Sequence, residues 1–503
     1  MIQKVLVANR GEIAVRIMRS CREMGISTVA VFSEVDRTAM HVRYANEAYC
    51  IGQAPSVESY LNIEKILEVA KKSGSDAIHP GYGFLSENAH FAERCQEEGI
   101  AFIGPSPYAI RTMGDKITAR RTMIAAGIPV VPGTVDKITS EKEALSVIEE
   151  IGLPVMIKAS AGGGGKGMRL VKEKSEILSA LRAARSEAAS AFGDDSVFIE
   201  KYIESPHHIE YQILADKQGH TVHLFERECS VQRRHQKVVE ETPSPLMTPQ
   251  KRIEMGLHAV AAAKAVDYFG AGTIEFIMDD NLNYYFLEMN TRLQVEHPIT
   301  ERVVGIDLVK AQIDIANEKP LPFSQEDLFQ HGHAIECRIY AEDTDQNFMP
   351  NPGVIRHITE PYGTGIRCDG YVYEGYEIPI YYDSMITKLI VWGYNRQDAI
   401  DRMKRALYEY KITGVKTSIR FLKRIMDTED FRSGHYNTHF IGNNKEFLFQ
   451  KGECFGKCED IALIATYLEY MSKAGRADNA EKSGSETSDT WRNSGRKYGI
   501  SPL

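Results

Sequence analysis

The sequence of 503 residues has little of several features that mark particular classes of protein. No apolar run approaches the ~20 residues that a helix needs to span a bilayer. The start MIQKVLVANR lacks the basic, apolar and small-residue regions of a signal peptide. A basic excess is also missing, because 60 Lys and Arg residues stand against 69 Asp and Glu residues, and the formal net charge is −9. We therefore expect neither a membrane protein nor a general nucleic-acid-binding protein.

Cysteine is scarce as well, with eight residues scattered along the chain. Only Cys454 and Cys458 lie close together, and no second pair of ligands follows them, so a zinc site is not expected. We expect reduced thiols and a cytoplasmic protein. The composition, 43% hydrophobic and 26% charged, is typical of a folded globular chain. The length predicts roughly three domains.

The first hundred residues alternate short apolar runs with amphipathic segments. KVLVANR, STVAVFS, DAIHP and AFIG are predicted strands, and EIAVRIMRSCREMG is a predicted helix. Strands separated by helices predict a doubly wound parallel sheet. Ligands bind beyond the carboxyl ends of such strands, so the loop HPGYGFLSEN (79–88) is either part of a site or a plain connector.

A glycine-rich segment, AGGGGKG, joins the predicted strands PVMIKAS and GMRLVKE. It is not a dinucleotide fingerprint, because a strand follows the glycines, and it is not a P-loop, because Gly167 follows Lys166. Lys158 lies on the first strand, and a helix (SEILSALRAARSEAASAFG) and a strand (VFIEKYI) come next. We interpret residues 162–167 as a lid over phosphate groups that closes when MgATP binds, in preference to a flexible turn.

An acidic hairpin is predicted over residues 272–298. A turn at residues 281–282 in an unbulged hairpin places Glu275 opposite Glu288. Two opposed carboxylates repel each other unless a cation lies between them, and Mg²⁺ suits such oxygen ligands. The alternative is an exposed strand face that tolerates two acids. The other face is predicted to supply the core contacts, from Ile274, Phe276, Met278, Tyr285, Leu287 and Met289.

Polar residues continue at every second position after this hairpin: Glu288, Asn290, Arg292, Gln294 and Glu296. If the chain stays extended, these side chains share one face. An arginine can hold an oxyanion through two hydrogen bonds, and a glutamate can act as a general base. The upstream segment CSVQRRHQKVVEE adds a cluster that is either solvated surface or part of an anion site, with Gln232, His235 and Lys237.

The C-terminal third is predicted to be mainly antiparallel, with strands in HAIECRIYAED, GVIRHITE and SMITKLIVWG and a helix at 397–410. After about residue 473 the chain is polar and is expected to be disordered. Before that tail, EDIALIATYLEYMS has apolar residues at helical spacing. Such a helix would pack on the body of the protein or dock on a partner.

Together these motifs resemble those of known enzymes. Lys116 in MGDK, Lys158 with the glycine loop, EKYI at 200–203 and the pair Glu275 and Glu288 resemble the ATP-grasp ligases. HPGYGFLSEN, RRHQKVVEE, EMNTRLQVEHP, HAIECRI and YYDSM resemble the biotin carboxylase component of biotin-dependent carboxylases, in uninterrupted order over residues 1–445. The resemblance implies an N-terminal domain (1–114), an ATP-grasp domain (115–330) with a lid at about 132–203, a C-terminal domain (331–446) and an extension (447–503).

The resemblance also implies residue roles. The implied contacts of ATP are Lys116, Lys158, Gly164, Gly165, Glu200, Lys201, Tyr202, Ile203, His208, Gln232, His235, Glu275 and Glu288. The implied ligands of Mg²⁺ or Mn²⁺ are Glu275, Glu288 and Asn290. The implied bicarbonate contacts are Lys237, Arg292, Gln294 and Val295, and the implied biotin contacts are Tyr82 and Arg338. The implied catalytic residues are Arg292, Glu296, Lys237 and Arg338.

The implied reaction is the ATP-dependent carboxylation of biotin by bicarbonate through carboxyphosphate. Two alternatives are an ATP-grasp ligase for another carboxylate, which would lack RRHQK with QVEHP, and a non-catalytic member, which the complete polar site disfavours. The final carboxyl acceptor stays open, because acetyl-CoA, propionyl-CoA and pyruvate systems share this component.

The sequence contains no Met-Lys-Met, the type of motif that carries biotin. We therefore expect biotin to arrive on a separate biotin carboxyl carrier protein and to pass to a carboxyltransferase subunit. The resemblance further implies a homodimer, with an interface that uses Arg16, Arg19 and Glu23 on a polar helix face, together with Arg367.

Overall fold

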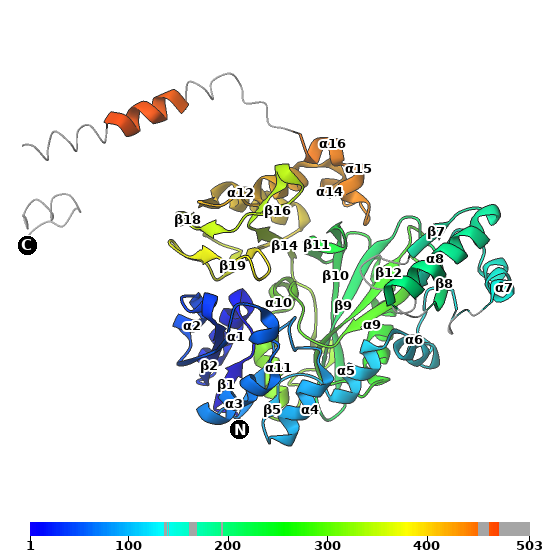
Figure 1. The fold of residues 1–503 in the computed structure, drawn as a ribbon, viewed down its shortest axis with the longest axis horizontal. Coiled ribbons are helices and arrows are strands. Elements are labelled where there is room, and N and C mark those ends of the chain that lie inside the picture. Colours follow the sequence, from blue (N-terminus) through cyan, green and yellow to red (C-terminus); the bar gives the residue numbers. More distant parts are fainter. Residues whose placement is uncertain (135–137, 139, 160–167, 193–194, 451–461, 472–503) are drawn as a thin grey trace, which may run out of the picture. The chain divides into compact units, whose positions relative to one another are not determined.

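The computed structural model describes residues 1–134, 138, 140–159, 168–192, 195–450 and 462–471. Residues Met1–Phe449 form one compact unit, and Gln450–Leu503 form a second. In the second unit residues 462–471 are helical, as their spacing predicts (Figure 1). The predicted glycine lid, both cysteines of the 454/458 pair and the predicted disordered tail lie outside the described residues. None of the helices in the described ranges is long and apolar enough to cross a membrane.

The N-terminal sheet is parallel, with the strand order β3-β2-β1-β4-β5, which confirms the predicted doubly wound class. Strand β3 was not predicted, because its residues alternate between partly buried and exposed at the edge of the sheet. The strands are β1 (Lys4–Val7), β2 (Ser27–Ser33), β3 (Glu47–Gly52), β4 (Ala77–His79) and β5 (Ala101–Phe102). The helices that follow them are α1 (Gly11–Glu23), α2 (Met40–Tyr44), α3 (Ile63–Ser73), α4 (Ala89–Glu97), α5 (Pro107–Gly114) and α6 (Lys116–Ala125).

Helix α1 buries Ile13, Ile17 and Cys21, as predicted from their spacing. The predicted polar face is wrong at Arg16, which is buried and pairs through Nη2 with Glu301 Oε1 at 2.7 Å. Because this partner lies on another helix of the same unit, Arg16 joins elements within the chain. Arg19, one turn further along, is exposed.

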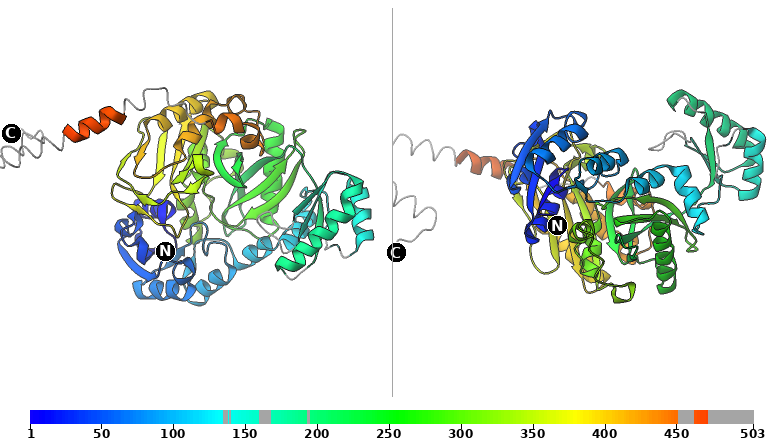
Figure 2. Two further views of the ribbon diagram at one scale, coloured as in Figure 1. Left: turned by 45° about the horizontal axis from the view of Figure 1, so that its top comes forward. Right: turned by 90° about the horizontal axis from the view of Figure 1, so that it is seen from below.

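A small lobe contains the three-stranded antiparallel sheet β7-β6-β8 (Figure 2). Its elements are α7 (Glu141–Ile151), β6 (Val155–Ala159), β7 (Met168–Val171), α8 (Ile177–Phe192) and β8 (Val197–Lys201). The two predicted strands that flank the glycine segment do pair, with Lys158 opposite Met168. Isoleucine, valine and leucine side chains of α7, α8 and the strands form a core of their own.

The largest sheet has eight strands in the order β13-β12-β9-β10-β11-β14-β21-β19. It runs through the predicted boundary at residue 330, because β11 pairs with β14. Its strands are β9 (His207–Ala215), β10 (Thr221–Arg233), β11 (Gln236–Thr242), β12 (Gly270–Met278), β13 (Tyr284–Asn290), β14 (His333–Tyr340), β19 (Ile366–Gly370) and β21 (Met385–Gly393). One continuous sheet therefore carries residues of two predicted domains into a single site.

Helices cover both faces of this sheet. α9 (Pro249–Lys264) and α12 (Arg396–Glu409) pack on one face, and α10 (His297–Val304) and α11 (Leu308–Ala316) pack on the other (Figure 1). The remaining helices are α13 (Ile419–Asp427), α14 (Glu429–Ser433), α15 (Phe440–Asn443) and α16 (Lys445–Leu448). The short strands are β15 (Glu342–Asp343), β16 (Met349–Pro350), β17 (Gly353–Val354), β18 (His357–Thr359), β20 (Glu377–Ile378) and β22 (Lys411–Thr413).

On the α12 side, Glu241 of β11 ties the sheet to the C-terminal helices. It accepts hydrogen bonds from Arg396 Nε at 2.8 Å and from Tyr436, and it lies 2.6 Å from His333 Nε2. These partners outweigh the burial of the group and lower the pKa of Glu241 to about 2. The neighbouring Glu240 faces the opposite side of the sheet, which is the side of the candidate site.

Candidate active site

The predicted acidic hairpin forms from β12 and β13. Glu275 lies opposite Glu288, and Thr273 lies opposite Asn290, as predicted. The hairpin is not unbulged, however, because Phe276 pairs with Phe286 and leaves Leu287 as an extra residue. Because of the bulge, the side chains of Tyr284 to Phe286 lie on the opposite face of the sheet from the one predicted. The core residues of this part of β13 are therefore Tyr284 and Phe286, while the predicted Leu287 is 44% exposed and Tyr285 is only partly buried.

Lys237 is the centre of the charged cluster in front of this hairpin. Its ammonium group lies 2.6 Å from Glu296 Oε1 and 3.0 Å from Glu275 Oε1, and it also contacts Glu210. Burial alone would lower the pKa of Lys237, but the three carboxylates raise it well above its usual value. Lys237 is therefore a permanent cation that three acids share.

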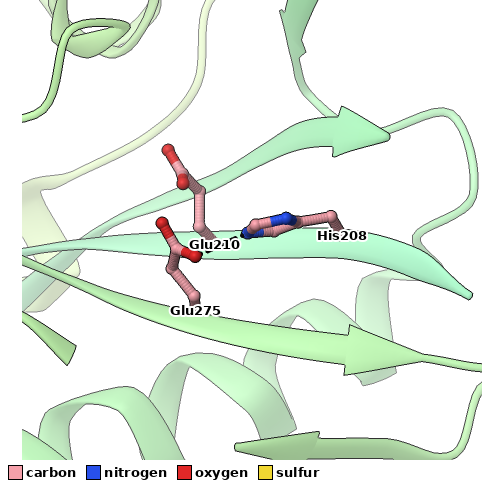
Figure 3. Close-up of side chains that lie close together, drawn as sticks. All are labelled: His208, Glu210 and Glu275. Atoms are coloured by element: carbon pink, nitrogen blue, oxygen red, sulfur yellow. Dashed lines mark ion pairs between the residues drawn. The ribbon is translucent and has the colours of Figure 1, made fainter. Parts of the chain in front are cut away.

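His208 and Glu210 of β9 lie beside Glu275 of β12 (Figure 3). His208 Nε2 is 2.8 Å from Glu275 Oε2. Burial raises the pKa of Glu275 less than Lys237 and His208 lower it, so the carboxyl group is an anion. One ligand atom from each of the three side chains lies within 4.8 Å of the others, but Lys237 already contacts both acids of this group. The Lys237 ammonium group therefore occupies this cluster, and Glu275 is the member of it that also lies opposite Glu288 in the hairpin.

Glu288 is the second acid of the hairpin. Among the described residues its carboxylate makes no hydrogen bond or ion pair, although it faces Glu275 across the hairpin. The Glu288 side chain is exposed to solvent, and its partial desolvation together with the charge of Glu275 raises its pKa. Asn290 donates from Nδ2 to Glu275 Oε1 at 2.8 Å, and its Oδ1 accepts from Arg292 Nη2 at 2.9 Å. The carboxylates of Glu275 and Glu288 and the amide oxygen of Asn290 are hard oxygen ligands of the kind that Mg²⁺ and Mn²⁺ prefer.

The segment 291–296 leaves the strand conformation after Asn290, so the prediction of one extended row is wrong in its backbone. The side chains nevertheless gather. Arg292 donates to Asn290 Oδ1 at 2.9 Å and to Gln294 Oε1 at 2.8 Å, and Gln294 Nε2 donates to Glu275 Oε1 at 3.2 Å. Hydrogen bonds between the side chains, rather than the alternation of a strand, therefore hold Arg292 and Gln294 beside Glu275.

Glu296 is completely buried between two cations. Its Oε1 accepts from Lys237 Nζ, and its Oε2 accepts from Arg338 Nη2 at 2.9 Å. Burial would raise its pKa, but Lys237 and Arg338 hold the pKa of Glu296 well below the usual range. Arg338 Nε in turn lies 2.7 Å from Glu240 Oε1. Glu296 therefore links the Lys237 cluster to Arg338.

A cavity of about 460 Å³ adjoins Arg338. Tyr82 and Val295 line it, together with Phe84, Tyr371 and Tyr382. Three residues of the loop 79–88, Tyr82, Gly83 and Phe84, thus line this cavity. The two residues predicted as biotin contacts, Tyr82 and Arg338, lie on the same cavity.

The remaining predicted nucleotide contacts lie along β6, β8, β9 and the hairpin of β10 and β11. Lys158 Nζ donates to Glu200 Oε2 at 2.5 Å, and Gln232 Nε2 lies 2.7 Å from His208 Nδ1. Strand β8 ends at Lys201, so Tyr202 and Ile203 follow the strand rather than extend it. Lys116, at the start of α6, and His235, in the turn between β10 and β11, are both exposed. Gly164 and Gly165 lie outside the described residues.

Sequence reasoning missed the acids and the arginine that position the predicted residues. Arg227 of β10 is fully buried and donates from Nε to Glu210 Oε1 at 2.5 Å and from Nη1 to Thr300 Oγ1 at 2.8 Å. Glu87 accepts from Arg292 Nε at 2.9 Å. The polar spacing of Glu210 and Gln212 in HHIEYQILA is the signal that could have indicated a second row on the same face.

Three family models match successive parts of the chain. They are the N-terminal domain of biotin carboxylase at residues 1–110, the ATP-binding domain of the carbamoyl-phosphate synthase L chain at 115–324, and the C-terminal domain of biotin carboxylase at 336–443.

Similar proteins match most of the chain. Biotin carboxylase of Nostoc sp. is 56% identical over 438 residues, which are 87% of this chain and 98% of that protein. Biotin carboxylase 1 of Bacillus subtilis is 55% identical, over 88% of this chain and 98% of that protein. A solved structure also matches, with 50% identity and a TM-score of 0.84 over 90% of this chain and 100% of the other. It is the biotin carboxylase domain dimer of Hydrogenobacter thermophilus 2-oxoglutarate carboxylase with MgADP, ADP and bicarbonate.

Proposed function

The chain belongs to the biotin carboxylase family of ATP-grasp enzymes, and from that premise we propose how its residues carboxylate biotin with ATP and bicarbonate. The observation that carries the proposal is the chain of contacts from Glu275 through Lys237 and Glu296 to Arg338. It joins the acidic hairpin, where a nucleotide with its metal would bind, to the cavity beside Tyr82. One buried ion-pair network therefore extends from the proposed nucleotide site to the proposed biotin cavity.

In this proposal the nucleotide lies between the small lobe and the acidic hairpin. Glu275, Glu288 and Asn290 would hold the divalent cation, which supplies positive charge to the phosphate oxygens when it is bound. The triphosphate and the base contact residues of the lobe, of β9 and of the β10–β11 hairpin. These are Lys116, Lys158, Gly164, Gly165, Glu200, Lys201, Tyr202, Ile203, His208, Gln232 and His235.

The anion site that we propose for bicarbonate is the segment 291–296 together with Lys237. Asn290 and Gln294 accept hydrogen bonds from the guanidinium group of Arg292 and fix its orientation. Such a guanidinium can bind an oxyanion through two hydrogen bonds. Gln294 and the backbone at Val295 complete the site, and Lys237 neutralises the charge that develops on the attacking oxygen.

Glu296 is the general base in the proposed mechanism. It accepts the proton of bicarbonate, whose oxygen attacks the γ-phosphorus of ATP and releases ADP. The product, carboxyphosphate, breaks down to CO₂ and phosphate. Phosphate takes the proton of the ureido nitrogen, Arg338 stabilises the oxygen that gains charge, and the nitrogen attacks CO₂. Tyr82 forms a wall of the biotin cavity, and the glycine lid excludes water from carboxyphosphate.

We propose that biotin reaches this cavity on a carrier protein and then visits a separate carboxyltransferase subunit. Tethering raises the local concentration of biotin and offsets weak binding of the small ligand. The domains in the proposal are residues 1–114, 115–330 with a lid at about 132–203, 331–446 and the extension 447–503. A cytoplasmic location agrees with the cysteines of the described ranges, which are free thiols.

A direct assay tests the proposed function. We expect ATP cleavage that depends on bicarbonate and that free biotin accelerates, with carboxybiotin as the product. ATP cleavage that another carboxylate stimulates, in place of bicarbonate and biotin, would instead indicate a different ligase of the ATP-grasp class. Nucleotide binding without any cleavage would indicate a non-catalytic member. Either result would contradict the proposal.

We further propose a homodimer through the N-terminal domain and the third domain. Arg19 and Glu23 are exposed on α1, where Glu23 pairs with Lys310 Nζ at 2.6 Å, whereas Arg16 and Arg367 both pair with Glu301 inside the unit. Light scattering at micromolar concentration is expected to give the mass of two chains. Reversal of charge at Arg19 (Arg19→Glu) should shift the mass toward one chain, and a monomer of the unchanged protein would refute the dimer.

A further inference from the structure

The walls of the cavity beside Arg338 come from segments that are distant in the sequence. Tyr82 lies in the loop after β4, and Val295 lies in the segment before α10. Beneath both of them lies a buried ion pair that the resemblance did not include. It joins Glu12, in the first turn of α1, to Lys388 of β21, with Nζ and Oε2 3.1 Å apart. Lys388 is 0% exposed and Glu12 is 4% exposed.

Each member of this pair holds a different wall of the cavity. Glu12 Oε1 accepts a hydrogen bond from the hydroxyl of Tyr82. Lys388 Nζ donates to the carbonyl oxygen of Val295 at 3.0 Å. The pair therefore fixes the distance between the aromatic wall of the cavity and the segment that carries Arg292 and Glu296.

We propose that Glu12 and Lys388 are positioning residues that hold Tyr82 and Val295 in place for the biotin ring. This inference rests on the proposed function, because it assigns the cavity to biotin. Lys388 does not line the cavity, and Glu12, which does, is already engaged there by the Tyr82 hydroxyl and by Lys388. They act through the hydroxyl of Tyr82 and the carbonyl group of Val295.

The backbone of the Tyr82 loop has its own support, which separates the role of Glu12 from general folding. Asn9 Nδ2 donates to the carbonyl oxygens of Pro80 and Tyr82, each at 2.8 Å. Gly81 has φ +65°, and a Cβ atom there would lie 3.0 Å from Asn9 Nδ2, so the loop fits closely against this residue. Loss of the Glu12 carboxylate should therefore free the end of the Tyr82 ring and leave the loop backbone in place.

The ion pair is not explained by stability alone. Replacement of a buried ion pair by apolar residues of similar volume is often neutral or stabilising. Burial raises the pKa of Glu12 to about 7, and Lys388 is the main group that opposes this rise. Removal of Lys388 would leave a protonated acid that binds the Tyr82 hydroxyl more weakly. This ion pair is costly to bury, and each of its members is hydrogen-bonded to a residue that lines the same cavity. Both facts are consistent with a positioning role.

The test compares Glu12→Gln, Tyr82→Phe and the double variant in steady-state assays with free biotin. Loss of a hydrogen bond to a charged group predicts a rise of about tenfold in KM for biotin in each single variant. Because Glu12 acts through the Tyr82 hydroxyl, the double variant should show no more than the larger of the single effects. KM for MgATP should not change.

A matched control is Glu241→Gln, which changes another buried, paired carboxylate on the far face of the sheet. It is expected to lower the melting temperature and to leave KM for biotin unchanged. If Glu12→Gln does not fold, the neutral pair Glu12→Gln with Lys388→Met carries the same test.

Equal rises in KM for biotin and for MgATP, or an unchanged KM for biotin in Glu12→Gln, would overturn the inference and leave the proposed function intact. Absence of biotin-dependent turnover in the unchanged protein would instead overturn the proposed function, and the inference with it.

Discussion

Glu296→Gln is expected to lower kcat for biotin-dependent ATP cleavage by about 10²–10⁴-fold, the usual contribution of a general base. The amide keeps the shape of the side chain but cannot accept the proton of bicarbonate. The variant should fold, because both cations beside Glu296 keep other partners. Lys237 retains Glu210 and Glu275, and Arg338 retains Glu240.

The measurement is steady-state ATP cleavage with bicarbonate and biotin, together with calorimetric binding of MgADP. Binding of MgADP should stay close to that of the unchanged protein, because Glu296 lies beyond the residues proposed for the metal. Glu336→Gln is the matched control. Glu336 is also fully buried on this face of the sheet, and burial raises its pKa well above the usual value. A neutral amide in its place should leave turnover near normal, whereas near-normal turnover of Glu296→Gln would refute the proposed base.

Local patterns in the sequence predicted which residues of the site form strands better than they predicted which face of the sheet each side chain occupies. The opposed pair Glu275 and Glu288 followed from turn chemistry and the period of two along a strand. The bulge at Leu287 did not, because its position depends on how β13 meets the neighbouring core. One extra residue was enough to exchange Leu287 for Phe286 on the buried side.

Partners from distant segments were the part of the site that could not be predicted from spacing. Glu12 looks like an ordinary acid in the first turn of a helix, a common place for one. Lys388 looks like a polar interruption of the strand SMITKLIVWG. Only the packing of α1 against the C-terminal sheet brings these two residues together beneath Tyr82.

Arg16 is another residue whose partners could not be predicted from spacing along the sequence. Its spacing with Arg19 and Glu23 predicted a polar helix face, which the resemblance assigned to a dimer interface. The side chain is instead buried, because Glu301 and Asp307 approach it from α10 and from the start of α11. A charged residue can belong to an interior network, and the pattern along its own helix carries no sign of the partners.

Lys237→Met should have the largest combined effect on stability and activity. Removal of one partner from a buried ion pair typically costs about 3–5 kcal/mol of unfolding free energy, because the remaining charge is left uncompensated. Here the remaining charges are Glu210, Glu275 and Glu296, which lie around a single ammonium group. At least one of these acids should bind a proton in the variant, and turnover should fall below detection.

A second substitution separates the two effects. Glu210→Gln in the Lys237→Met background removes one of the three acids that have lost the Lys237 ammonium group, while Arg227, the other partner of Glu210, keeps Thr273 and Thr300 as hydrogen-bond partners. Denaturant unfolding should show that the double variant recovers part of the lost stability. Activity should not return, because the cation that faces bicarbonate and the γ-phosphate is still missing. Recovery of turnover together with stability would mean that Lys237 only holds the fold, and it would remove Lys237 from the proposed mechanism.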